Sequence, residues 1–247
     1  MNLATALSVG DCTCVVGAGG KKTTLYALAA RLDRAVLTAT VRIPIFDEQV
    51  ARVAVTDDPA GAIDRTDERP LGVVPERERE DRYLGYDPRV VSDLAEEVDD
   101  PLLVKADGAR TRWLKAPDER EPQLPHEVDT VLPIASARVV GEPLTDERVH
   151  RPERVAQVTE RAVGGEIEPS DVAEVLASPQ GGLKYAPEGA TVVPVVNMVD
   201  NGELEAVGRQ IARGVLDRAG PDTQPPTVSR VVLARMTAPD PVVGVVE

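Results

Sequence analysis

The chain has 247 residues, and its 42 acidic side chains against 28 lysines and arginines give a formal net charge of −14. This charge excludes function classes that need a broadly basic surface, such as general binding of nucleic acid or of an anionic membrane. An anionic ligand must therefore be bound by positive charge that is concentrated locally.

Lysine is scarce, with only five lysines against 23 arginines. High acidity with little lysine is typical of proteins from salt-adapted organisms, in which carboxylates keep the surface hydrated. A lysine retained against this background is less expected as surface filler. All five lie in or beside turns marked by glycine or proline: Lys21, Lys22, Lys105, Lys115 and Lys184.

No apolar stretch approaches the ~20 residues that a membrane-spanning helix needs. The first residues also lack the basic start and long apolar core of a secretory signal. We therefore expect a cytoplasmic protein with no membrane partner. The length suits a single α/β domain over residues 1–247.

The first predicted elements are a strand at 11–16 and a helix at 22–32. Glycines between them let the backbone turn tightly, and the amino end of the helix would direct free N–H groups at an anion. A lysine adds a full charge, and a threonine hydroxyl can hold Mg²⁺, so the turn suits Mg²⁺ with ATP or GTP. The predicted ligand-binding residues are Gly17, Ala18, Gly19, Gly20, Lys21, Lys22, Thr23 and Thr24.

This turn departs from the standard P-loop pattern G-x-x-x-x-G-K-[ST]. With Lys21 as the phosphate lysine, Val15 stands at the first glycine position and Lys22 at the hydroxyl position. Alternatively, Lys22 and Thr23 form the lysine–hydroxyl pair. We favour Lys21 because it directly follows Gly20, and the choice between the two lysines stays open.

A second strand is predicted at 35–39 and a helix at 88–98. Between them, the segment 57–82 is rich in Asp, Glu and Arg and has little hydrophobic period. We expect this segment to be a charged, solvated insertion.

Asp107 follows a strand predicted at 101–104. A carboxylate at a strand end can hold Mg²⁺, directly or through water, beside the phosphates of a nucleotide. Arg110, Arg112 and Lys115 come next, and clustered cations suit a second anionic substrate or the charge on a phosphoryl group in transfer. The predicted catalytic residues are Lys21, Asp107, Arg110 and Lys115, and the predicted metal ligands are Thr23 and Asp107.

Later strands are predicted at 128–134, 191–197 and 229–234, and later helices at 153–161, 170–177 and 203–218. Alternating strands and helices predict an α/β fold with a mainly parallel sheet flanked by helices, and the turn makes it P-loop nucleoside triphosphatase-like. Ligands of such sheets bind at the carboxyl ends of the strands. The glycine turn lies at such an end.

Asn197 and Asp200 end the strand at 191–197 in the order Asn-Met-Val-Asp. Many GTPases carry Asn-Lys-x-Asp at such a strand end, where the aspartate accepts hydrogen bonds from guanine. Met198 replaces the lysine and can cover a base without adding charge. Asn197 and Asp200 are therefore candidate base-binding residues, and the choice between ATP and GTP stays open.

The order of these motifs resembles the YqeC family, accessory proteins of selenium-dependent molybdenum hydroxylases, from about Cys14 to Asp200. The chain departs from the family pattern at Lys22, Lys105, Arg120 and Met198. Its most specific matching element comprises Asp107, Gly108, Leu114, Lys115, Ala116, Pro117, Glu121, Pro122 and Pro125.

The resemblance implies a P-loop nucleoside triphosphatase that helps to mature a molybdenum hydroxylase, which would be its client protein. We expect a phosphohydrolase or phosphoryl-transfer enzyme that takes Mg-nucleotide and a second, anionic small molecule. Two alternatives stay open. One is a non-hydrolysing carrier of phosphate or a molybdopterin-like ligand, and the other is a ligase-type enzyme that activates a carboxylate as an acyl phosphate.

Overall fold

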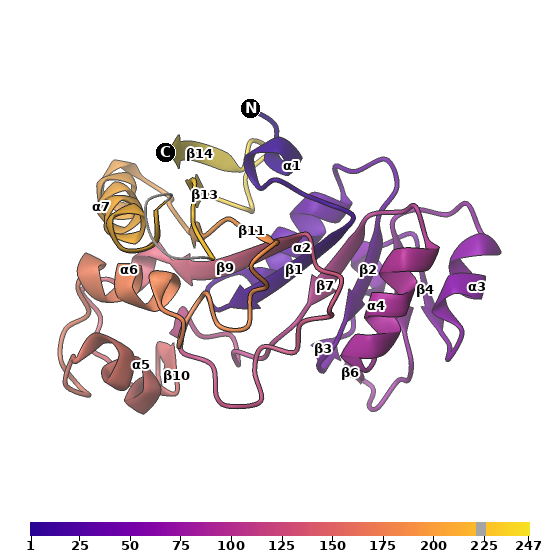
Figure 1. The fold of residues 1–247 in the computed structure, drawn as a ribbon, viewed down its shortest axis with the longest axis horizontal. Helices are drawn as coiled ribbons and strands as arrows, with labels where there is room; N and C mark the ends of the chain where they lie inside the picture. The colour runs from indigo at the N-terminus through magenta and orange to yellow at the C-terminus, as the bar shows by residue number, and fades with distance from the viewer. Residues whose placement is uncertain (221–225) are drawn as a thin grey trace.

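The computed structural model describes residues 1–220 and 226–247, and helices pack on both faces of one large sheet (Figure 1). Its strands are β1 (Cys12–Gly17), β2 (Val36–Ala39), β4 (Arg52–Val55), β5 (Leu71–Val74), β7 (Leu102–Lys105), β9 (Thr130–Ser136), β11 (Thr191–Val192), β12 (Val195–Asn197), β13 (Val231–Ala234) and β14 (Val242–Val246). The strand order is β14-β13-β12-β9-β1-β7-β2-β5-β4, with β11 paired to β9 beside that path. All of these pairs are parallel except β13 with β14.

The sheet is buried on both faces because successive side chains on each strand point to opposite sides. In β1, Cys14 and Val16 join one apolar cluster, whereas Val15 joins the other. In β7, Val104 and Leu103 divide in the same way. Such continuous apolar runs are typical of parallel strands with helices on both sides.

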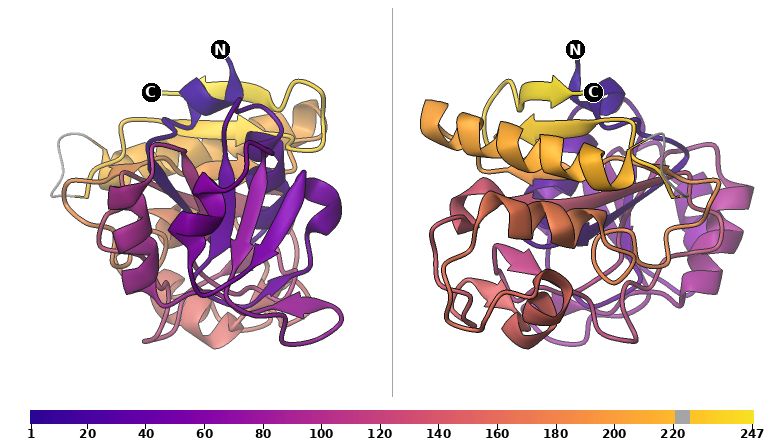
Figure 2. Two further views of the ribbon diagram at one scale, coloured as in Figure 1. Left: turned by 90° about the vertical axis from the view of Figure 1, so that its right-hand side faces the viewer. Right: turned by 60° about the vertical axis from the view of Figure 1, so that its left-hand side comes forward.

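The helices are α1 (Leu3–Ala6), α2 (Lys21–Ala29), α3 (Pro59–Asp64), α4 (Pro88–Glu97), α5 (Pro152–Thr159), α6 (Pro169–Ala177) and α7 (Gly202–Ala219). Buried residues of α1 and α2 belong to one cluster, and those of α3 to α7 belong to the cluster on the opposite face. Figure 2 shows α7 lying alongside α6, and both chain ends at one edge of the molecule. The expected mainly parallel sheet flanked by helices is therefore confirmed.

The position of β1 determines where the site lies. From β1 the chain passes through α2 to β2, which is not its neighbour, because β7 lies between them. After β7 the chain crosses to β9 on the other side of β1. The chain therefore changes direction around β1, and in such sheets the crevice at this point binds ligands.

The charged segment 57–82 has short structure of its own. It contains α3 and also β5, whose four residues are all buried. β5 pairs with β2 on one side and β4 on the other, so it is an interior strand of the main sheet. The run is only four residues long and has charged neighbours, which hides it when hydrophobicity is averaged over a longer window.

The strand expected at 191–197 is two short strands, β11 and β12. Pro194 lies between them, and its lack of an N–H group interrupts the ladder. Two further short pairs lie outside the main sheet: β3 (Ile43–Pro44) with β6 (Arg82–Tyr83), and β8 (Leu114–Lys115) with β10 (Val149–His150). Among residues 1–220 and 226–247, no helix combines the length and the apolar character that crossing a membrane requires.

Candidate anion-binding site

The glycine turn is built so that only glycine fits. Gly17, Gly19 and Gly20 have φ of +87°, +88° and +128°, a region that residues with a Cβ rarely adopt. A Cβ on Gly17 would lie 2.4 Å from the carbonyl oxygen of Ile134, and one on Gly20 would lie 2.1 Å from Nδ2 of Asn197. The turn therefore passes directly over β9 and the end of β12.

The turn leads straight into α2, whose first residue is Lys21 and whose N-cap, Gly20, makes no side-chain capping bond. Among the described residues, the backbone N–H groups of Lys21, Lys22 and Thr23 find no protein acceptor. These donors and the positive end of the helix dipole favour an anion in front of the turn.

Lys21 folds back under the turn. Its Nζ donates to the carbonyl oxygen of Gly17 and lies 2.6 Å from Oδ1 of Asp107. The other carboxylate oxygen of Asp107 accepts from the N–H of Gly17 at 2.9 Å. Asp107 thus ties the end of β1 to the start of α2 from the loop that follows β7.

Asp107 is a buried carboxylate held in its charged form. Burial by itself would raise its pKa, but the ammonium groups of Lys21 and Lys115 outweigh that effect, so its pKa lies below the ordinary value. Burial lowers the pKa of Lys21, and the charge of Asp107 opposes this shift. The pair therefore depends on both partners being present.

Lys115 does not face the ligand space where a second anion was expected. Its side chain has no exposed surface, and its Nζ lies 2.9 Å from Oδ2 of Asp107 and 2.7 Å from Oε2 of Glu121. It also donates to the carbonyl oxygen of Gly108 at 2.5 Å. With three oxygens around it, Lys115 holds the loop together, and direct contact with a second substrate does not fit this arrangement.

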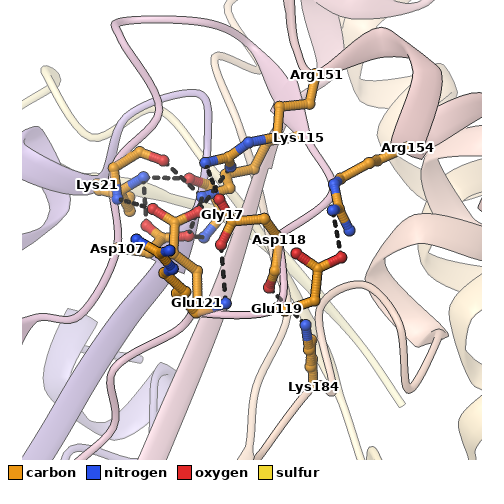
Figure 3. A network of polar contacts seen from close by, with 12 residues as sticks. Gly17, Lys21, Asp107, Lys115, Asp118, Glu119, Glu121, Arg151, Arg154 and Lys184 are labelled. Carbon is orange, nitrogen blue, oxygen red and sulfur yellow. Dashed lines mark hydrogen bonds and ion pairs between the residues drawn. The ribbon is translucent and has the colours of Figure 1, made fainter.

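The same polar network extends away from the turn (Figure 3). Glu121 accepts from Arg151 at 2.7 Å, and Arg151 also donates to Asp118 at 2.6 Å. Burial opposes the charge of Glu121, but Lys115 and Arg151 lower its pKa to about 2. Lys184 donates to the carbonyl oxygen of Asp118 at 2.6 Å, which brings the loop before β11 into the network.

A cavity of about 680 Å³ opens in front of the turn. Among the described residues, Glu121 is the one carboxylate that lines it, and Glu121 is already paired with cations. The basic residues that line the cavity are Lys21, Lys22, Arg42, Arg82, Lys105, Arg110, Arg112 and Arg151. In a chain with a net charge of −14, this is the local concentration of positive charge that an anionic ligand requires.

Backbone strain is concentrated at this cavity. Arg110 and Thr111 have φ of +47° and +61°, and Arg151 and Met198 have φ of +62° and +60°. All four line the cavity. Left-handed conformations cost free energy for residues other than glycine and cluster at functional sites.

A family model described as "YqeC protein" matches residues 13–153, more than half of the chain. The chain belongs to the YqeC family. An Escherichia coli (strain K12) protein named "Uncharacterized protein YqeC" is 30% identical over 189 residues, which are 74% of this chain and 74% of the relative. The YqeC match includes the glycine turn and Asp107, and no solved structure matches the chain.

Several residues predicted from the sequence do come together. Ala18, Gly19, Gly20, Lys21, Lys22, Thr23, Arg110 and Arg112 all line the cavity. Gly17 and Asp107 lie directly beneath it, bonded to each other and to Lys21. Thr24 is fully buried, and its hydroxyl donates to the carbonyl oxygen of Gly20, so it stabilises the helix start and does not face the ligand space.

Asn197 and Asp200 do not line the cavity. The amide of Asn197 donates to the carbonyl oxygen of Gly19 at 2.9 Å and accepts from the N–H of Met236 at 3.2 Å. Asp200 is paired with Arg138 at 2.7 Å. In this arrangement Asn197 positions the turn, and neither side chain is free to contact a base.

Sequence reasoning gave no site role to Lys105, Arg82 and Arg151, which also line the cavity. Arg82 and Arg151 are far from the turn in sequence, and arginine is common in this chain, so the sequence does not mark either of them as a site residue. Lys105 does carry one, because lysine is scarce and this residue follows a buried run.

Proposed function

We propose that the chain binds a Mg-nucleoside triphosphate, ATP or GTP, at the glycine turn and acts in the maturation of selenium-dependent molybdenum hydroxylases. One observation carries the proposal. A tight glycine turn and a helix start with unpaired N–H groups open onto a cavity lined by eight cations in an otherwise acidic protein. Membership of the YqeC family fits the maturation role that the resemblance implies.

The turn residues divide the work of holding a triphosphate. Backbone N–H groups at the start of α2 donate to phosphate oxygens, and Lys21 supplies charge from within the turn. Lys22 lines the cavity and forms no ion pair among the described residues, so it adds a second charge. Either lysine can serve as the main phosphate lysine: Lys21 is already held by Gly17 and Asp107 beneath the turn, whereas Lys22 is unpaired among the described residues and lines the cavity.

The residues fit a magnesium ion that takes most of its ligands from phosphates and water, as this ion commonly does. Thr23 lines the cavity, so its hydroxyl can contribute one oxygen. Asp107 has both oxygens within 2.9 Å of lysine ammonium groups, so direct ligation by Asp107 does not fit this arrangement. Bound Mg²⁺ would neutralise phosphate charge, and we propose that Asp107 acts by positioning Lys21.

Arg110 and Arg112 suit a second anionic substrate or a phosphoryl group in transfer. Both line the cavity, and neither forms an ion pair with a carboxylate among the described residues. The left-handed backbone at Arg110 and Thr111 places them there at a cost in free energy, which stronger binding of an anion would offset. Positioning and charge stabilisation are the main protein contributions to phosphoryl transfer.

A passive carrier remains a second candidate, and one observation favours it. In the part of the chain that the structure describes, Glu121 is the single carboxylate lining the cavity. Its pKa of about 2 and its bonds to Lys115 and Arg151 make it a poor general base. His150 also lines the cavity, and burial and nearby cations lower its pKa to about 4, so at neutral pH it is uncharged and only weakly basic. The enzyme reading therefore depends on His150 or on a substrate group as the base.

Phosphate release separates these two candidates. The enzyme reading predicts that purified protein releases phosphate from MgATP or MgGTP faster than an Asp107→Asn variant does, and also faster than His150→Gln where His150 is the base. If the wild type binds nucleotide but releases phosphate no faster than either variant, it is a carrier. If the wild type binds neither nucleotide, the proposal fails.

A further inference from the structure

The cavity has a group of cations that the triphosphate site does not use. They come from the end of β7 and from the β3–β6 pair, and we name them the β3–β6 pole: Arg42, Arg82 and Lys105. Lys105 Nζ donates to the backbone carbonyl of Arg42 at 2.7 Å, which fixes this pair of strands against the sheet. The pole belongs to different elements from the glycine turn and from the 107–113 loop.

Lys105 is a buried cation that forms no ion pair with any carboxylate of residues 1–220 and 226–247. Its residue is only 6% exposed, and the neighbouring carboxylates, Asp107 and Glu121, already contact other cations. Burying an ammonium group that lacks an anionic partner costs free energy. The chain has 42 acidic residues, yet no described carboxylate is placed as the partner of Lys105. The position next to its ammonium group can therefore take an anion from a ligand.

Arg82 adds a second cation that lines the cavity. Among the described residues, its one ion pair is a 3.5 Å contact with the adjacent Asp81, so its guanidinium is only weakly paired. The guanidinium of Arg42, in contrast, is held by Glu78 at 2.6 Å, so Arg42 serves mainly to frame the pole. A compact oxyanion accepts hydrogen bonds from an arginine and a lysine at the same time.

We infer that the β3–β6 pole is a binding subsite for a phosphate monoester group, distinct from the triphosphate site. The two cations Lys105 and Arg82 match the charge of such a dianion, and the cavity has the size of a small-molecule pocket. Assigning this group to the second substrate rests on the proposed function, whereas the subsite itself rests on the cavity. The second substrate is therefore a phosphorylated small molecule.

Burial and the nearby charge of Lys21 lower the pKa of Lys105 to about 7, although Asp107 opposes this shift and Lys115 reinforces it. Other charged groups around the cavity are Arg42, Arg82 and Glu121. A dianion at the pole favours the protonated lysine, so binding takes up protons near neutral pH. Lys105→Arg keeps the charge and removes the proton uptake.

Isothermal titration calorimetry of the full chain with glycerol 3-phosphate and with MgATP tests the subsite. We expect Lys105→Met and Arg82→Gln each to weaken glycerol 3-phosphate by roughly tenfold or more, with MgATP affinity changed by less than about threefold. Lys105→Arg should restore binding of glycerol 3-phosphate without proton uptake. Lys22→Ala, the matched control at the turn, should weaken MgATP more than glycerol 3-phosphate.

The inference is overturned if glycerol 3-phosphate does not bind, or if it binds equally to wild type, Lys105→Met and Arg82→Gln. It is also overturned if these variants weaken both ligands by the same factor, because the pole would then hold the nucleotide itself. If MgATP fails to bind but glycerol 3-phosphate binds through Lys105, the subsite stands and the nucleotide proposal falls. Arg82→Gln changes a side chain that is 41% exposed, so we expect this substitution to leave the fold intact. It therefore tests the subsite even where Lys105→Met alters folding.

Discussion

At the residue scale, Gly20 is one of three tightly constrained glycines in the turn. Its φ of +128° is open to glycine, and a Cβ there would meet the Asn197 amide that holds Gly19. Any larger residue at Gly20 therefore displaces the turn and the N–H groups behind it. We therefore expect nucleotide binding and local stability both to depend on the absence of a Cβ at Gly20.

We predict that Gly20→Ala destabilises the protein by about 1–3 kcal/mol and abolishes nucleotide binding, because the strained backbone and the clash move the turn. Denaturant unfolding and calorimetry measure the two effects. Gly189→Ala is the control, since a Cβ there meets nothing within 4 Å. Nucleotide binding by Gly20→Ala at wild-type affinity would contradict the assigned turn.

Lys105 makes a pH-dependent contribution to stability. Its pKa falls from 10.5 to about 7 on folding, so between these values the unfolded chain binds more protons than the folded one. The free energy of unfolding therefore rises with pH across this window, and the cost of burying Lys105 is largest below it. We predict that Lys105→Met raises the melting temperature more at about pH 6 than at about pH 10.

Lys22→Met is the matched control, because it removes the same charge from a more exposed position. Its melting temperature is measured at the same two pH values. An equal gain for Lys105→Met at both pH values would show that its ammonium group is not buried at a cost.

The network around Lys115 links several elements. Through Asp107 and Glu121 it joins the end of β1, the start of α2 and the loop after β8. Arg151, at the start of α5, completes the connection (Figure 3). The turn is therefore held by elements that are distant in sequence.

We predict that Lys115→Met lowers the free energy of unfolding by about 3–5 kcal/mol, because it leaves the buried carboxylate of Asp107 and the partly buried carboxylate of Glu121 with fewer cations. The shift of the urea midpoint measures this. Lys184→Met removes the same charge but breaks one bond to a carbonyl, so a loss of about 1 kcal/mol is expected. Equal effects from the two variants would show that the network does not stabilise the fold.

Sequence patterns predicted the main parallel strands and their helices, because buried runs of four to seven residues alternate with helical spacing. They missed β5 because it is short and lies among charges, and β14 because all five of its residues are only partly buried. They placed Asp107 beside the turn correctly, since strand ends meet at one edge of a sheet. The inward orientation of Lys115 depends on where Asp107 and Glu121 lie in space, which spacing cannot supply.

At the scale of the whole molecule, the chain is strongly acidic, whereas the cavity in front of the glycine turn is lined mainly by basic side chains. Three of the five lysines line the cavity, and Lys115 and Lys184 belong to the network beside it. The expectation that retained lysines are not surface filler is consistent with this placement. The lysine side chains are therefore concentrated at one edge of the sheet.

The measurement that tests the central claim most directly is calorimetric titration of MgATP and MgGTP into the full chain in high salt. We predict that the wild type binds nucleotide and that Lys21→Ala/Lys22→Ala loses affinity by roughly tenfold or more, because both lysine charges of the turn are removed. Lys184→Ala, which alters a lysine away from the turn, should bind as the wild type does. Equal affinity in the wild type and the double variant, or no binding of either nucleotide by the wild type, would contradict the account.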